Sequence, residues 1–309
     1  MKKVIFYFLV GATTVASVLS CRQDVGEVVP SVKIISDGVS LRNGRIAFET
    51  LDDFKKTIEG LKAMSESQRK EWDAKVGHSS MQNLYDNVEG MVDGVVNPVY
   101  RTKQGDYPYI ADILFARIVN TEGLFQLGNV VHCIKMKGKE LTTEEKNAAL
   151  LLTNPVHSTI KSHDISVILE GADANSTKAN AKVGGYEYPL VGYDFGNNRV
   201  AGAVFSKSTF FMYQSYAMKL QMRRLGGWWI FTSWQAENAE SLNISLAGFG
   251  AYSVGSGNFY GGSGSGSCSN CSDAYAFLAE FYGPIILDVV NVGGNFQVNY
   301  GGQQVNFSR

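Results

Sequence analysis

The chain has 309 residues, of which 28 are lysine or arginine and 29 are aspartate or glutamate, so its formal net charge is −1. No run or cluster of basic residues stands out. This argues against a nucleic-acid partner, because such binding needs lysine and arginine gathered on one face. A chain of this length is long enough to bury a large core, either as one β-rich domain or as two packed modules.

The N-terminus predicts an exported protein. Lys2 and Lys3 precede an apolar run over residues 4–18, which is shorter than the roughly 20 residues that a membrane-spanning helix needs. A basic end, an apolar middle and small residues at the exit are typical of a secretory signal. We therefore interpret residues 1–20 as a signal peptide.

The exit of this signal resembles the bacterial lipobox. It reads Val18-Leu19-Ser20-Cys21, with Leu19 in place of the smaller residue that is commoner there. The resemblance implies cleavage before Cys21 and attachment of acyl chains, palmitate among them, to that cysteine. An ordinary signal peptide followed by an incidental cysteine is the alternative. Because two or three acyl chains anchor a protein stably, we expect an outer-membrane lipoprotein that faces the periplasm or the surface, with residues 21–31 as a tether.

The first part of the mature chain, residues 32–170, predicts an α+β half. Asn43-Gly44 lies between two short alternating runs and favours a tight hairpin. A first helix is indicated by apolar residues at helical spacing, namely Leu51, Phe54, Ile58 and Leu61. A second is indicated by a capping box at Ser65 and Gln68 and by a stop at Gly77.

Further along this half, the pattern predicts a short helix over residues 110–119 and two strands over 124–127 and 130–136. Thr142 and Glu145 are then expected to cap a helix that continues to Leu152.

The stretch 171–185 is small and polar and is the predicted boundary between two halves. The second half, residues 186–309, predicts an antiparallel β-rich region. Residues 210–222 alternate as in a long half-buried strand, and "RRLGGWW" is expected to turn the chain. The Gly/Ser-rich stretch 248–269 is expected to be a loop. The predicted fold class is therefore α+β, with a small helix-bearing N-terminal half and an antiparallel β-rich C-terminal half.

Three stretches resemble a large set of Bacteroides-type exported lipoproteins of unknown function. They are "SLRNGRIAFETLDDFKKTIEGLKAMSESQRKEWDAKVG", "ADILFARIVNTEGLFQLGNVVHCIKMKG" and "NNRVAGAVFSKSTFFMYQSYAMKLQMRRLGGWW", about a third of the chain. The second contains an N-x-x-G-x-x-Q-x-G run made by Asn120, Gly123, Gln126 and Gly128. The resemblance implies an envelope lipoprotein and supplies no catalytic residues.

Three cysteines remain if Cys21 is acylated. Cys268 and Cys271 form a C-x-x-C after seven Gly and Ser residues, without the strand and helix that a thioredoxin-type site needs. We interpret the pair as a local disulfide or as free thiols. Zinc binding or redox chemistry is the minor alternative, because a zinc site needs further ligands at suitable spacing. Cys133 lies in an apolar strand beside His132, where neighbouring side chains point to opposite faces, and is expected to be buried.

No motif for catalysis is present. The chain has neither H-E-x-x-H nor G-x-S-x-G, and its Gly-rich stretch is followed by no helix or βαβ unit. Ser158, His163 and Asp164 could form a triad, but sequence proximity is a poor guide to triads. Several carboxylates could serve a glycosidase, and none is singled out: Asp112, Glu122, Asp194, Glu237 and Asp288. We therefore expect no catalytic residue, no metal site and no cofactor.

Aromatic usage gives the one functional indication. Of the 15 Tyr and 17 Phe residues, Tyr252, Phe259 and Tyr260 lie in the Gly/Ser-rich stretch and are the candidates for stacking on a ligand. The sequence therefore favours a lipid-anchored envelope protein that binds a glycan or a protein partner without catalysis. A polysaccharide hydrolase and a structural subunit of a surface assembly are the alternatives.

Overall fold

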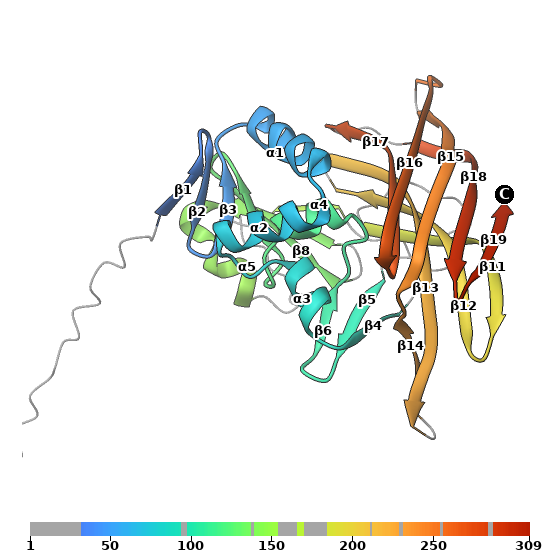
Figure 1. Cartoon of the computed structure of the whole chain (residues 1–309). Helices are drawn as coiled ribbons and strands as arrows, with labels where there is room; N and C mark the ends of the chain where they lie inside the picture. The colour runs from blue at the N-terminus through green and yellow to red at the C-terminus, as the bar shows by residue number, and fades with distance from the viewer. Residues whose placement is uncertain are drawn as a thin grey trace, which may run out of the picture.

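The computed structural model describes residues 32–309 except 94–97, 137–138, 154–165, 170–183, 211, 229–230, 254–255 and 284–286 (Figure 1). The fold is mixed α+β, with helices and a mixed sheet in the N-terminal half and antiparallel sheets in the C-terminal half. The predicted fold class is thus confirmed. Cys21, the expected tether and most of the expected boundary lie outside the described residues.

A seven-stranded sheet forms the base of the N-terminal half, in the order β1-β2-β3-β7-β8-β9-β10. Its strands pair antiparallel except β3 and β7, which run parallel. Asn43 and Gly44 both have positive φ, which confirms the predicted hairpin between β2 and β3. The strands are β1 (Val32–Ser36), β2 (Val39–Arg42), β3 (Arg45–Phe48), β7 (Leu124–Leu127), β8 (Val130–Lys135), β9 (Lys139–Glu144) and β10 (Ser166–Leu169).

Short helices and a small sheet complete this half. The capping box at Ser65 and the left-handed stop at Gly77 are confirmed, with φ of 74° at Gly77. Thr142, however, lies within β9 opposite His132, so the helix that was expected to begin there begins later. These elements are α1 (Leu51–Ala63), α2 (Glu66–Val76), α3 (Met81–Asn87), α4 (Ile113–Ile118), a 3-10 turn (Glu145–Asn147), α5 (Ala149–Thr153), β4 (Gly90–Asp93), β5 (Val99–Thr102) and β6 (Asp106–Pro108).

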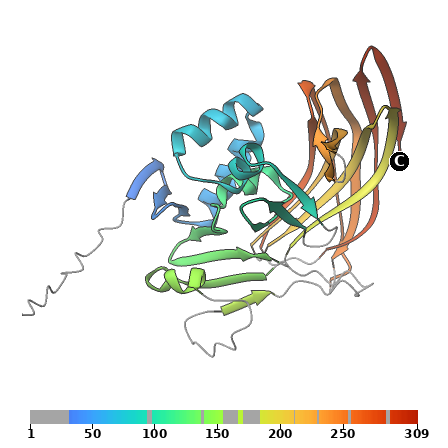
Figure 2. The same ribbon diagram turned by 90° about the horizontal axis from the view of Figure 1, so that it is seen from below.

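Two antiparallel sheets lie face to face in the C-terminal half (Figure 2). The inner sheet, which lies against the N-terminal half, contains β11 (Gly184–Gly196), β12 (Arg199–Thr209), β13 (Tyr213–Trp228), β14 (Phe231–Ala236) and β17 (Asp273–Tyr282). The outer sheet has the order β16-β15-β18-β19, with β15 (Ala239–Ser253), β16 (Phe259–Cys271), β18 (Leu287–Tyr300) and β19 (Gln303–Ser308).

Strand β13 is buried on both faces. Tyr216, Met218 and Leu220 point into the core between the two sheets, as their shared parity predicts. Tyr213 lies on the opposite face and belongs to the core of the N-terminal half. The expectation of a half-buried strand was therefore wrong, because Tyr213, Ser215 and Lys219 of the second face are buried as well. The turn expected at "RRLGGWW" is also corrected for residues 223–228, since β13 continues to Trp228, paired with β14.

Phe54 of α1 lies where the two halves meet. It is 1% exposed, and its ring packs against the rings of Phe48, Phe115, Phe125, Tyr213 and Tyr282 at centroid distances of 5.2–6.4 Å. Tyr213 and Tyr282 belong to the inner sheet, and the other three rings to the N-terminal half. One aromatic cluster therefore holds the two halves together.

The Gly/Ser-rich stretch is not a loop, which corrects the sequence-based expectation. Apart from residues 254–255, which are not described, most of it lies in β15 and β16. On β16 the glycines alternate with exposed serines, and a Cβ on Gly262, Gly264 or Gly266 would collide with main-chain oxygens of β17. Glycine is required there because β16 lies directly over the free edge of the inner sheet. That edge is thereby protected from pairing with another chain.

Candidate functional site

The outer face of the outer sheet carries two of the three predicted stacking residues. Tyr252 and Phe259 pair across β15 and β16 with their ring centroids 5.2 Å apart, and they are 49% and 61% exposed. The Phe259 ring lies over Gly250, since a Cβ there would approach Cζ of Phe259 to 2.8 Å. Tyr260 lies on the inner face instead, with its ring against Phe281.

A β-bulge in β15 brings an exposed leucine onto the same face. Leu246 has a φ of +52° and is 81% exposed. The register of β15 shifts at this point against both β16 and β18. Since β15 is hydrogen-bonded on both sides and its inner face is core, an exposed side chain must point outward, as Ser245 beside it does. A left-handed conformation costs a non-glycine residue about 1–2 kcal/mol, so the fold tolerates strain in order to place this leucine outward.

Next to the bulge, uncharged polar side chains form three rows across β15, β18 and β19. The strand register places Asn243 beside Gln297 and Gln297 beside Asn306. A second row contains Ser245, Asn295 and Ser308, and a third contains Ser241, Asn299 and Gln304. The first two rows surround a shallow hollow of about 370 Å³, lined by Asn243, Ser245, Asn295, Phe296, Gln297, Asn306, Phe307 and Ser308.

The chemistry of this hollow is that of neutral hydrogen bonding. None of the eight lining residues carries a charge. Each Asn or Gln amide offers two donors and one acceptor oxygen, and each Ser hydroxyl offers a donor and an acceptor. The third row shows one such contact, in which the Asn299 amide donates to Ser241 Oγ at 2.7 Å. We call this face, from the hollow to Tyr252 and Phe259, the amide face.

The sequence of β18 carries part of the pattern of the amide face. In β18, Asn295, Gln297 and Asn299 alternate with inward-facing Phe296, Val298 and Tyr300. The residues of β15 and β19 that complete the amide face cannot be predicted from the sequence, because their position beside β18 depends on the register of the three strands.

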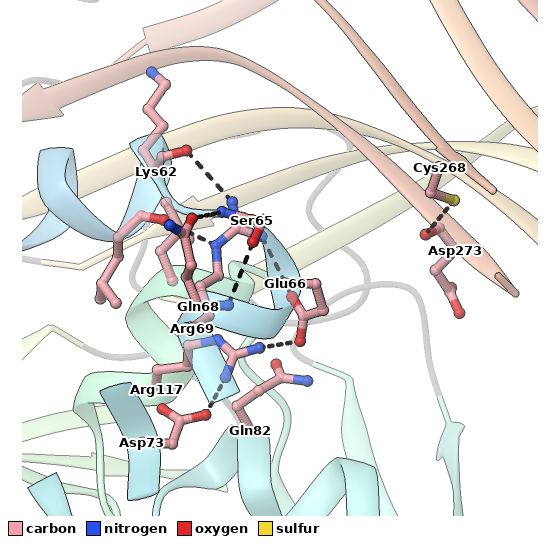
Figure 3. A network of polar contacts seen from close by, with 12 residues as sticks. Lys62, Ser65, Glu66, Gln68, Arg69, Asp73, Gln82, Arg117, Cys268 and Asp273 are labelled. Carbon is pink, nitrogen blue, oxygen red and sulfur yellow. Dashed lines mark hydrogen bonds and ion pairs between the residues drawn. The ribbon is translucent and has the colours of Figure 1, made fainter. Parts of the chain in front are cut away.

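A buried polar network lies elsewhere and has a structural role (Figure 3). Arg117 of α4 is 1% exposed and pairs with Asp73 and Glu66 of α2. Arg69 donates to the main-chain oxygen of Leu61 at 2.8 Å, which ties α2 to the end of α1. The network fixes three helices against one another rather than lining a hollow.

Two titratable groups beside Arg117 have perturbed pKa values. Burial raises the pKa of Asp73 to about 6, although the charge of Arg117 opposes this. Burial also lowers the pKa of His78 to about 4, against smaller opposing effects of main-chain groups of Ile118 and Arg117. Both residues are about 5% exposed, and as the pH falls Asp73 loses its charge whereas His78 gains one.

His132 and Cys133 lie on opposite faces of β8, as their adjacency predicts. His132 Nδ1 lies 2.7 Å from Glu140 Oε1 and its ring stacks on Phe125. Cys133 is buried in a separate small cluster, where burial raises the pKa of its thiol. Within the described residues, no three His, Cys, Asp or Glu side chains lie so that they could hold a metal ion.

Cys268 and Cys271 form a disulfide at the end of β16, with their Cα atoms 6.1 Å apart. Cys268 Sγ lies 3.2 Å from the main-chain oxygen of Asp273, and the two residues appear together in Figure 3. A disulfide sulfur carries no proton, so this is a close contact without donation. Because only Ser272 separates Cys271 from β17, the disulfide closes the corner between the two sheets.

Three of the five carboxylates considered for hydrolysis are engaged in other contacts. Asp112 is buried, accepts from main-chain N–H groups at the start of α4 and accepts from Tyr213 at 2.7 Å. Asp194 accepts from the N–H of Gly196 two residues on, as an aspartate in a turn commonly does. Glu237 accepts from Arg199 and Tyr300. Ser158, His163 and Asp164 lie outside the described residues.

The N-x-x-G-x-x-Q-x-G run builds the turn before β7. Asn120 accepts from the N–H of Leu124 at 2.8 Å and donates to the Gly44 oxygen at 3.1 Å. Gly123 and Gly128 have positive φ, and Gln126 is fully buried between Arg45 and the Gly128 oxygen. The motif on which the resemblance rests therefore has a structural role.

Comparison with known proteins adds one structural likeness. No protein-family model matches the chain, and no curated protein matches it. A crystal structure of a DUF4848 family protein from Bacteroides thetaiotaomicron matches with 10% sequence identity, over 90% of this chain and 99% of that one, with a TM-score of 0.24. At this TM-score the likeness carries no argument about function.

Proposed function

We propose that the protein is a lipid-anchored protein of the bacterial outer membrane that binds a neutral glycan on the amide face. The observation that carries the proposal is the uncharged hollow, which is lined by amide and hydroxyl groups on three neighbouring strands. Sugar hydroxyls both donate and accept, so side chains that do the same are suitable partners. Binding sites of this kind need few ordered polar groups beside an apolar contact.

The exposed aromatic pair supports the same class of ligand. Tyr252 and Phe259 present ring surface at the other end of the amide face, where a sugar can stack. Both rings are held in place, Phe259 by its seat over Gly250 and Tyr252 by its contact with Phe259. A ligand that reaches both the rings and the hollow has several sugar units, since strand residues rise about 3.3 Å each.

The arrangement of the chain suits an anchored binding protein. Strand β1, the first described element, lies at the end of the molecule opposite the outer sheet in both views (Figures 1 and 2). A lipid on Cys21, joined to β1 by the tether, would leave the amide face pointing away from the membrane. No helix in the described residues is long and apolar enough to cross a membrane.

The anchor is tested by cell fractionation of Cys21→Ala. We expect the variant to leave the membrane fraction, because it cannot carry the acyl chains that would anchor the parent protein. Protease treatment of intact cells then assigns the protein to the periplasm or to the surface. Retention of the variant in the membrane fraction would overturn the anchor.

The binding is tested on an array of neutral and charged glycans. We expect binding to neutral oligosaccharides, and we expect Asn295→Ala and Asn306→Ala each to weaken it roughly fivefold, the worth of one neutral hydrogen bond of about 1 kcal/mol. Lys56→Ala is the matched control, because Lys56 is exposed on α1 in the other half. An array without any binding would overturn the proposal and favour a protein partner. Release of reducing ends would favour the hydrolase instead.

A further inference from the structure

We infer that the glycan recognised by the amide face carries N-acyl groups, so that the ligand class is N-acetylated neutral oligosaccharides. This inference rests on the proposed function and specifies the ligand. It follows from the position of Leu246 beside a set of amides, and each part of an acetamido group meets a matching partner there.

The first partner is apolar. Leu246 is 81% exposed at a strained backbone position, although its neighbours Ser245 and Asn295 on this face are polar. β-bulges and strained backbone conformations are frequent at functional sites, where they redirect a side chain. A sugar ring with only hydroxyl substituents offers few methyl groups to this leucine. The methyl of an acetamido group offers the compact apolar contact that Leu246 can make.

The second partner is amide chemistry. An acetamido group has one N–H donor and one carbonyl acceptor, separated as they are in the side chain of Asn or Gln. Gln297 lies between Asn243 and Asn306 in the register, and Asn295 lies opposite Ser245. A row of such amides can donate to the acyl oxygen and accept from the acyl N–H. Repetition of amides in adjacent rows matches a ligand in which acetamido groups recur.

The third feature is charge. The hollow is lined without any charged side chain, so it offers no cation for a carboxylate-bearing sugar and no carboxylate for an amino sugar with a free amine. An amine that is acylated is neutral and fits this lining.

The test is a matched pair of ligands, measured by titration calorimetry with the whole mature protein. Chitotetraose and cellotetraose share the β-1,4 backbone and differ in the acetamido or hydroxyl group on each ring. We expect chitotetraose to bind roughly tenfold more tightly, the smallest ratio that one added apolar contact gives in a binding site. Equal affinities, or tighter binding of cellotetraose, would overturn the inference.

A variant at the bulge distinguishes the apolar contact of Leu246 from the hydrogen bonding of the amides. Leu246→Gly removes the side chain and relieves the left-handed strain, so the variant is expected to fold. It should lose the preference for chitotetraose while keeping binding to other neutral glycans of the array. Met91→Ala is the control, since Met91 is also an exposed apolar residue but lies on β4 in the other half. A preference that survives Leu246→Gly would overturn the role of the leucine, whereas an array without binding would overturn the proposed function as well.

Discussion

Gly266 of β16 lies directly against the main-chain oxygen of Tyr275 in β17, so closely that a Cβ on the glycine would collide with it. The contact joins the outer sheet to the free edge of the inner sheet. It gives the alternating glycines of β16 a structural reason.

Gly266→Ala should therefore destabilise the fold. Because the obstacle is backbone, the strands must move apart, and we expect a loss of about 2–3 kcal/mol in the free energy of unfolding, as for other overpacked sites. Urea denaturation measures this loss. Ser265→Ala is the control, since Ser265 lies on the exposed parity of β16 and should change stability by less than about 0.5 kcal/mol. Equal effects of the two variants would show that β16 and β17 are not in close contact.

Phe54→Ala should destabilise both halves together. The substitution leaves a cavity among five aromatic rings, and removal of a buried phenylalanine costs about 3–5 kcal/mol. Thermal unfolding followed by near-UV and far-UV circular dichroism should show one transition at a lower temperature. Lys56→Ala, on the exposed side of the same helix, is the control. Two separate transitions in Phe54→Ala would contradict the shared core.

The pH dependence of stability should reveal the two buried groups beside Arg117. His78 has a folded pKa of about 4, below its usual 6.5, so it costs stability as the pH falls from 6.5 to 4. Asp73 has a folded pKa of about 6, above its usual 3.8, so it adds stability as the pH falls from 6 to 3.8. The two effects cancel between about pH 4 and pH 6 in the parent protein.

Asp73→Asn removes one side of this balance. Relative to the parent, the variant should lose about 1.4 kcal/mol of stability for each unit by which the pH falls from 6 to 4.5. Denaturant melts at several pH values measure the difference, in which the contributions of other groups cancel. Parallel pH profiles of the two proteins would show that Asp73 does not take up a proton in this range.

The cysteines should differ in reactivity. In lipidated protein unfolded without reductant, we expect one thiol per chain, that of Cys133, because Cys268 and Cys271 are joined. After reduction the count should rise to three. The double variant Cys268→Ser, Cys271→Ser should lose about 2 kcal/mol, as expected for a very short closed loop. Labelling of three thiols without reductant would contradict the disulfide.

Local signals in the sequence predicted local structure well. Asn43-Gly44, the capping box at Ser65 and the stop at Gly77 each depend on neighbouring residues only, and each is confirmed. The capping prediction at Thr142 failed because pairing of β9 with β8 continues through that residue. Tertiary pairing there outweighs a local preference for a helix start.

The larger errors have a common physical origin. Considered one by one, the glycines of β16 indicate a loop. Their alternation along the strand is explained only by the backbone of β17, which leaves no room for a Cβ at every second residue. Gly226 and Gly227 likewise belong to β13, where they pair with Ser233 and Thr232 of β14. The amide face was missed because Asn243, Gln297 and Asn306 meet through register. The close approach of strands that are far apart in the sequence cannot be predicted from the residues of either strand alone.

The contact between Lys62 and Glu280 has a consequence for the order in which the chain can fold. Their side chains form an ion pair at 2.8 Å although 218 residues separate them. Such long-range contacts form late, because the entropy of closing the loop is lost before the contact is gained. The core around Phe54 is therefore complete only once β17 has docked and placed Tyr282 against it. A chain that stops before residue 273 should be degraded rather than persist as a smaller folded protein.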